Sequence, residues 1–84
     1  MVLTPKFIRL VFSKTQGSYS DAEALRLAIR NCGEREMNHL AARGGNGTHL
    51  LITESQVQEL IVEGSHQGYW RFDATTKTYR ISVA

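Results

Sequence analysis

Aromatic and basic residues alternate in the C-terminal segment 66–83, which reads HQGYWRFDATTKTYRISV. Aromatic rings can stack on nucleic-acid bases, and arginine and lysine side chains neutralise phosphates. Tyr69, Arg71 and Arg80 are spaced so that one face of an extended structure could carry both kinds of group. The segment therefore predicts a surface that binds an anionic partner.

The same segment is typical of a β-hairpin, and its side chains favour one register. With an even-numbered loop around residues 75–76, Phe72 lies opposite Tyr79 and Trp70 lies opposite Ile81. That register gathers the apolar side chains on one face. An odd-numbered loop would scatter them over both faces, which a half-buried sheet does not tolerate. We therefore expect the even-numbered loop.

The two faces of this hairpin are expected to serve different purposes. Trp70 and Phe72 belong to the apolar face and are expected in the core. On the other face Arg71 lies directly opposite Arg80, a pairing that costs up to roughly 1 kcal/mol unless a carboxylate, solvent or a bound anion relieves it. The open face, the hairpin loop and a basic residue near the N-terminus together give the predicted binding residues: Arg9, Tyr69, Arg71, Lys77 and Arg80.

Residues that could support catalysis or bind a metal occur elsewhere, without a recognised arrangement. The available metal ligands are Cys32, Glu36, His39, His49 and His66. None of them lies at the spacing of a known metal motif, and a cysteine within an apolar helical stripe is usually inert. The glycine-rich loop 44–47 follows a predicted helix, whereas phosphate-binding loops precede one. We therefore expect no catalytic residue, no metal and no cofactor.

Length and composition set broad limits on the protein class. A chain of 84 residues, 42% of them hydrophobic and 21% charged, predicts one globular domain spanning residues 1–84. The net charge of +2 is too small to indicate a nucleic-acid binder by itself. A single cysteine favours a reducing compartment, and no stretch approaches the roughly 18 apolar residues of a membrane helix. A cytoplasmic protein without membrane contact is expected.

The N-terminal segment 6–13, KFIRLVFS, allows two interpretations. Its β-branched and aromatic residues favour a strand that presents Phe7, Arg9 and Val11 beside the open face of the hairpin. Thr4 followed by Pro5 is also a good helix start, as N-cap and first helical residue. We favour the strand, with the helix as the alternative.

The middle of the chain predicts two helices around a short strand. Ser20 and Glu23 match a capping box that opens the first helix, which either ends at Gly33 or continues to residue 43. Residues 48–52, THLLI, indicate a short buried strand. Thr53 and Gln56 match a second capping box, and the helix that follows is expected to stop at Gly64. Residues 15–19 are expected to be a loop.

These elements give the order β-α-β-α-β-β, an α+β domain of two layers with the helices on one face of a small sheet that ends in the hairpin. If the N-terminal segment is helical, the domain resembles a winged helix. Residues 68–81 are similar to the wing of several bacterial regulator families. The resemblance implies that the helix before the hairpin enters the major groove. That helix carries Glu54, Glu59 and Glu63 and no basic residue, so the groove's phosphates would repel it, and no residue is assigned from the resemblance.

The sequence therefore predicts a non-catalytic binding module that recognises an anionic partner, with nucleic acid favoured. The alternative is a protein-interaction domain in which the same face forms the interface of a homo-oligomer, most simply a homodimer. A chain of this length has a marginal core, so self-association would add useful burial, and we expect a homo-oligomer.

Overall fold

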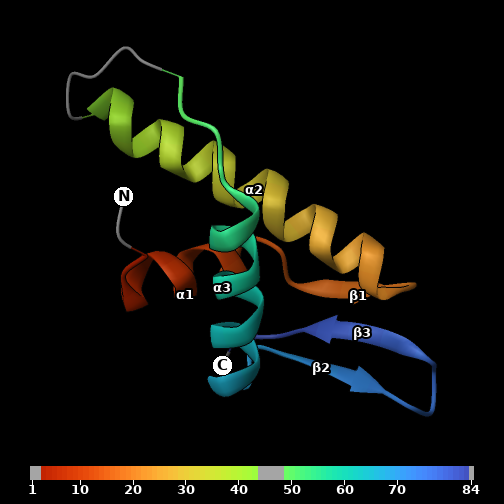
Figure 1. Ribbon diagram of the computed structural model, residues 1–84. Coiled ribbons are helices and arrows are strands. Elements are labelled where there is room, and N and C mark those ends of the chain that lie inside the picture. The colour runs from red at the N-terminus through yellow and green to blue at the C-terminus, as the bar shows by residue number, and fades with distance from the viewer. Residues whose placement is uncertain (1–2, 44–48, 84) are drawn as a thin grey trace.

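The computed structural model describes residues 3–43 and 49–83, and this part of the chain forms three helices and a three-stranded antiparallel sheet (Figure 1). The mixed α+β class is confirmed, but the order β-α-β-α-β-β is wrong. The observed elements are, in chain order, α1 (Pro5–Ser13), β1 (Gly17–Tyr19), α2 (Ala22–Arg43), α3 (Glu54–His66), β2 (Trp70–Asp73) and β3 (Thr78–Ile81).

The predicted strand at residues 6–13 is wrong, because α1 occupies this segment. Thr4 is the N-cap: its side-chain oxygen accepts a hydrogen bond from the Phe7 amide at 3.1 Å, and Pro5 follows in the first turn. The buried residues Phe7, Ile8, Val11 and Phe12 recur with the helical period, and they line the side of α1 that packs on α2 and α3. Phe7 and Val11 thus belong to the core instead of an open sheet face.

The long helix α2 continues through Gly33, the second of the two outcomes that the sequence left open. A Cβ on Gly33 would lie 2.9 Å from Ile52 Cδ1 and 3.2 Å from Leu60 Cδ1, so the glycine permits the close packing of α3 and the segment before it. The helix begins one residue later than the predicted capping box. Asp21, and not Ser20, accepts the capping hydrogen bond, from the Ala24 amide at 2.8 Å.

The strand predicted at residues 48–52 is also wrong: residues 49–53 form no strand, and residue 48 lies outside the described residues, as does the glycine-rich loop 44–47. Side chains of α2 make hydrogen bonds to the backbone of this segment, as a neighbouring strand would in a sheet. Asn38 accepts from the Leu50 amide at 2.7 Å and donates to the Leu50 carbonyl at 2.9 Å. Glu34 accepts from the Ile52 amide at 2.9 Å. These contacts satisfy backbone groups of Leu50 and Ile52 without a β-ladder.

The capping box predicted at the start of α3 is confirmed: Thr53 and Gln56 exchange side-chain and backbone hydrogen bonds. The predicted stop at Gly64 is wrong, since the helix runs on to His66. Gly64 instead gives room to the Phe12 ring, whose nearest atom would lie 2.2 Å from a Cβ on this residue. The helix ends in a Schellman motif at Gly68, which has a φ of 75°.

The sheet has the strand order β1-β3-β2, and β1 lies within a segment that the sequence predicted to be a loop. The predicted hairpin register is confirmed: Trp70 pairs with Ile81, and Phe72 pairs with Tyr79. The loop comprises residues 74–77. The Ser82 amide donates to the Tyr69 carbonyl at 2.9 Å, which extends the contact between the two arms toward α3.

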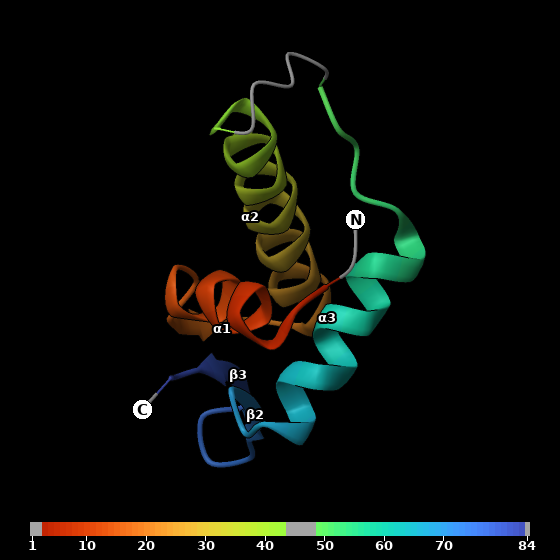
Figure 2. The same ribbon diagram turned by 90° about the vertical axis from the view of Figure 1, so that its left-hand side faces the viewer.

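The core is shared mainly by the three helices. Among its fully buried side chains are Phe12, Ile29, Val57 and Leu60, while Ile81 is the strand residue that joins them. Figures 1 and 2 show α2 rising away from the sheet, so that its C-terminal end lies far from the hairpin. One end of the domain is thus a helical assembly, and the other is the hairpin.

Candidate functional site

A concave surface of the described residues lies beside the hairpin. We call it the hairpin hollow; it has a volume of about 820 Å³ and combines the exposed side of α1, the turn after α3 and both arms of the hairpin. Its lining residues are Arg9, Gln67, Gly68, Tyr69, Arg71, Phe72, Asp73, Ala74, Arg80 and Ser82.

Four of the five binding residues proposed from the sequence line this hollow: Arg9, Tyr69, Arg71 and Arg80. Arg9 reaches it from α1 rather than from a strand, because the helical turn leaves this position exposed between buried neighbours. The fifth residue, Lys77, does not line the hollow. It lies exposed in the hairpin loop, with a φ of 57°.

The two hairpin arginines are directly opposite one another in adjacent strands, as the register predicted. Arg80 Nη1 lies 3.8 Å from Asp73 Oδ2, a long and exposed ion pair. Within the part of the chain that the structure describes, the Arg71 side chain makes no hydrogen bond or ion pair. The hollow therefore carries more positive charge than its own carboxylate, Asp73, can balance.

Asp73 is committed mainly to the hairpin loop. Its side chain accepts hydrogen bonds from the Thr75 amide at 2.9 Å and the Thr76 amide at 3.4 Å. These two amides, with a smaller contribution from Arg80, hold the pKa of the Asp73 carboxyl below its ordinary value. The carboxylate thus fixes the loop and screens one arginine only weakly.

Tyr69 forms a packed part of the hollow wall. Its ring packs against the buried Phe12 ring with centroids 5.6 Å apart, and the residue is half-buried. This contact connects the hollow to α1 at the point where Gly64 lets α3 approach. The tyrosine therefore joins the predicted site through packing that the sequence did not reveal.

Phe72 is the aromatic lining residue that the sequence-based prediction did not include. It was expected in the core, but its exposed fraction is 50%. The register correctly placed it on the same face as Trp70 and Tyr79, and those two residues are half-buried as expected of a sheet over a core. Phe72 lies beyond the part of the hairpin that the rest of the domain covers. No pattern in the sequence shows how far along the hairpin this cover extends.

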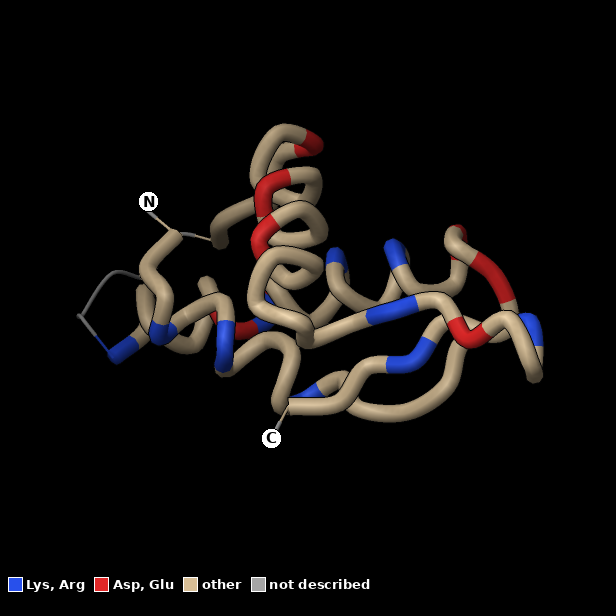
Figure 3. The backbone as a smooth tube through the Cα atoms, turned by 90° about the horizontal axis from the view of Figure 1, so that it is seen from below, with Lys and Arg blue, Asp and Glu red and all other residues tan. Residues whose placement is uncertain are grey.

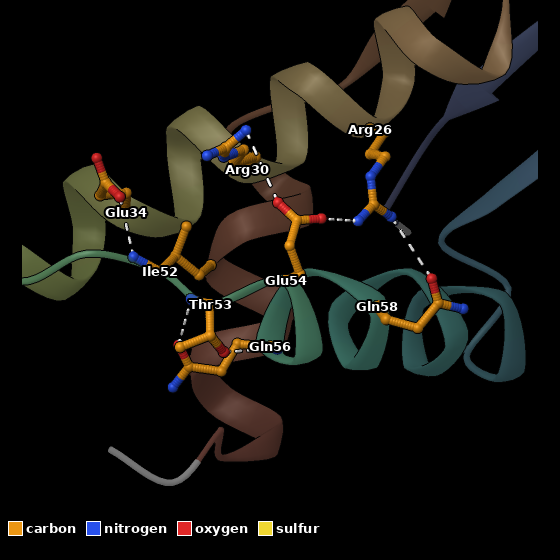
Figure 4. Close-up of polar contacts among 8 residues, drawn as sticks. All are labelled: Arg26, Arg30, Glu34, Ile52, Thr53, Glu54, Gln56 and Gln58. Carbon is orange, nitrogen blue, oxygen red and sulfur yellow. Dashed lines mark hydrogen bonds and ion pairs between the residues drawn. The ribbon is translucent and has the colours of Figure 1, made fainter.

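Helix α3, unlike the hairpin, carries acidic side chains, and one of them forms ion pairs with α2. Glu54 in its first turn forms an ion pair with Arg26 of α2, and a second, at 3.8 Å, with Arg30 (Figure 4). Arg26 also donates to the Gln58 side chain at 3.5 Å. Figure 3 shows the acidic positions of α3 as a column separate from the basic positions along the hairpin strands.

A buried carboxylate, Glu36, lies away from the hollow. Its Oε1 is 3.2 Å from Lys14 Nζ, and its Oε2 lies 3.8 Å from His39 Nδ1 but accepts no hydrogen bond from the described residues. Burial raises the pKa of the neighbouring Cys32 thiol, and the Cys32 Sγ lies 3.7 Å from the Val11 carbonyl. This arrangement disfavours a thiolate nucleophile and ties α2 to the end of α1.

Among the residues that the structure describes, no three His, Cys, Asp or Glu side chains come close enough together to hold a metal ion. The same residues include no helix with the length and apolar character needed to cross a membrane. No protein-family model matches the chain, and comparison with curated proteins and with solved structures finds no significant match.

Proposed function

We propose that the chain is a non-catalytic nucleic-acid-binding domain that holds phosphates in the hairpin hollow. The observation that carries the proposal is the convergence of Arg9, from α1, with Arg71 and Arg80, from paired strands, on one concave surface. Guanidinium groups match the geometry of phosphate oxygens and remain charged at every physiological pH.

The opposed arginines give the proposal its physical basis. Two like charges directly across a strand pair destabilise the hairpin by up to roughly 1 kcal/mol. A phosphate bound between them would turn this repulsion into two attractions. Because the strand pairing already fixes the backbone at Arg71 and Arg80, little ordering is needed when the anion arrives.

The order of elements and the strand order β1-β3-β2 support a winged-helix-like domain, the alternative that the sequence raised. In that family the helix before the wing normally reads the major groove. Here α3 presents Glu59 and Glu63, while its Glu54 already occupies two arginines of α2. We therefore assign phosphate binding to the hairpin hollow and not to α3.

The test is a titration of fluorescent single-stranded and duplex oligonucleotides, read by anisotropy at about 50 and 200 mM salt. We expect binding that weakens as salt rises, because counterions are released when phosphates are neutralised. The variant Arg71→Ala/Arg80→Ala should lose most of this affinity.

The matched control is Arg35→Ala/Arg43→Ala, which removes the same charge from the second half of α2. Because Figures 1 and 2 place the C-terminal part of α2 far from the hairpin, this variant should retain most of the affinity of the wild type. Equal losses in both variants would mean a diffuse charge effect. No binding of the wild type at low salt would overturn the proposal, and a dimeric mass by light scattering would then favour the alternative, a homo-oligomer interface on the same face.

A further inference from the structure

Phe72 ends a row of three aromatic side chains that runs outward along the hairpin. The ring centroids of Trp70 and Tyr79 are 5.9 Å apart, and those of Tyr79 and Phe72 are 5.1 Å apart. At the inner end, the Trp70 indole Nε1 donates to the Ile61 carbonyl of α3 at 2.7 Å. The Phe72 ring is therefore held in place by packing from within, although half of its surface is exposed.

The position of β2 makes this ring accessible from the hollow. β2 is an outer strand, since the sheet order is β1-β3-β2, and no other described strand covers its free edge. Alternation along the strand directs Arg71 and Phe72 to opposite faces. Both residues nevertheless line the hairpin hollow, which therefore extends to the edge of β2.

We propose that Phe72 stacks on a base of a single-stranded nucleic acid whose phosphates lie on Arg71 and Arg80. The inference rests on the proposed function and names its substrate class. A flexible strand can pass over the edge of β2 with its phosphates on one side and an unstacked base on the other. In a duplex the base faces are already stacked on one another, so the ring could reach one only at the cost of unstacking.

The charge around Phe72 favours this partner over an apolar protein surface. A protein that filled the hairpin hollow to cover Phe72 by hydrophobic contact alone would also cover Arg71 and Arg80, which line the same hollow, and would remove their charges from water without compensation. A nucleotide supplies the ring face and the compensating anion in one unit. This combination of stacking and phosphate contacts is the general mode of single-strand recognition.

The experiment compares three ligands of equal length: a single strand, its duplex, and a single strand of abasic sites, which keeps the phosphates and lacks the bases. The variant is Phe72→Leu, which keeps an apolar side chain without the ring, and the conservative control is Phe72→Tyr. The single tryptophan, Trp70, reports on the integrity of the aromatic row through its emission in each free variant.

We expect the wild type to bind the base-containing single strand more tightly than the duplex or the abasic strand. Phe72→Leu should weaken binding to that single strand by about fivefold or more, the lower range for loss of one stacked base. It should leave the abasic strand unaffected, and Phe72→Tyr should bind as the wild type does.

Unchanged single-strand binding by a folded Phe72→Leu variant would overturn the inference, as would equal wild-type affinity for the base-containing and abasic strands. If binding in those cases is still lost in Arg71→Ala/Arg80→Ala, the proposed function stands and the stacking role alone fails. If the wild type binds none of the three ligands at low salt, both proposals fail.

Discussion

The α2–α3 contact and the hairpin each contain two arginines and one carboxylate, but only in the first do both arginines pair with it. Arg26 and Arg30 share the carboxylate of Glu54, and Arg26 also reaches Gln58. Arg71 and Arg80 face one another, and the nearby Asp73 is held by the loop amides. Arginines in the first region connect two helices. Those in the second lie opposite one another, a like-charge pairing that costs the free domain stability, and among the described residues the Arg71 side chain has no carboxylate partner.

The largest expected effect concerns the packing that supports both regions. Gly64→Ala should destabilise the fold by roughly 1–3 kcal/mol, because the new Cβ meets the fully buried Phe12 ring, and this overpacking outweighs the gain of about 1 kcal/mol in helix propensity. Urea unfolding measures it, with the exposed Ser65→Ala on the same helix as a control. An unchanged midpoint would mean that α1 and α3 do not pack rigidly, and that the hollow between α1 and the hairpin is not preformed.

Single substitutions should separate the two pairs of arginines. Arg26→Ala should lower the free energy of unfolding by about 0.5–1 kcal/mol, since it removes a partly exposed pair, and should leave nucleic-acid affinity unchanged. Arg71→Ala should weaken binding and reduce the slope of log affinity against log salt by about one. If Arg26→Ala weakened binding as much as Arg71→Ala, the distinction between structural and ligand-binding arginines would fail.

The cost of the opposed arginines can be measured in the free protein. Arg71→Thr should raise the free energy of unfolding by a few tenths of a kcal/mol up to roughly 1 kcal/mol at low salt, because it removes the like-charge pair and introduces a residue of high β propensity. The gain should shrink as salt screens the repulsion. Arg71→Lys keeps the charge and should show no such gain. A loss of stability in Arg71→Thr would mean that Arg71 supports the hairpin.

The smallest expected effect is the pH dependence contributed by Asp73. Its pKa in the folded protein lies below the ordinary value of 3.8, so its stabilising contribution is present above that value and is lost as pH falls through the lower folded pKa. The stability difference between the wild type and Asp73→Asn should therefore narrow below about pH 4. Thermal unfolding between neutral and acid pH measures this, and a difference that stays constant would show that the loop amides do not favour the charged form.

At neutral pH the same variant should bind nucleic acid more tightly, because the hollow loses its carboxylate.

How far the sequence could predict the structure depended on the range of the interactions involved. The hairpin register followed from matching Phe72 with Tyr79, which is a local pairing, and the capping box at Thr53 involves atoms three residues apart. The N-terminal segment was misjudged because its β-branched and aromatic residues outweighed a correct cap signal at Thr4. The segment around Leu50 was misjudged because its hydrogen-bond partner, Asn38, lies on another element.

The residues of the candidate site were likewise predictable only where local spacing fixes their position. The alternation of residues in the hairpin was enough to oppose Arg71 and Arg80, since side chains in a strand alternate between two faces. Arg9 was chosen for its presumed place on a strand, and it reaches the hollow for a different reason, from the exposed side of α1. Phe72 could not be recognised from its sequence position, because its exposure depends on how far the helices extend over the sheet.

By itself, the sequence determined the features that depend on periodicity and short-range hydrogen bonds: the α+β class, the cap of α3, and a hairpin with an apolar and a basic face. Only the tertiary structure decided that the N-terminal segment is helical, that α2 side chains take the place of strand partners, and that Phe72 remains exposed beside the arginines. These outcomes depend on contacts between residues far apart in the chain, and neither propensity nor spacing encodes such contacts.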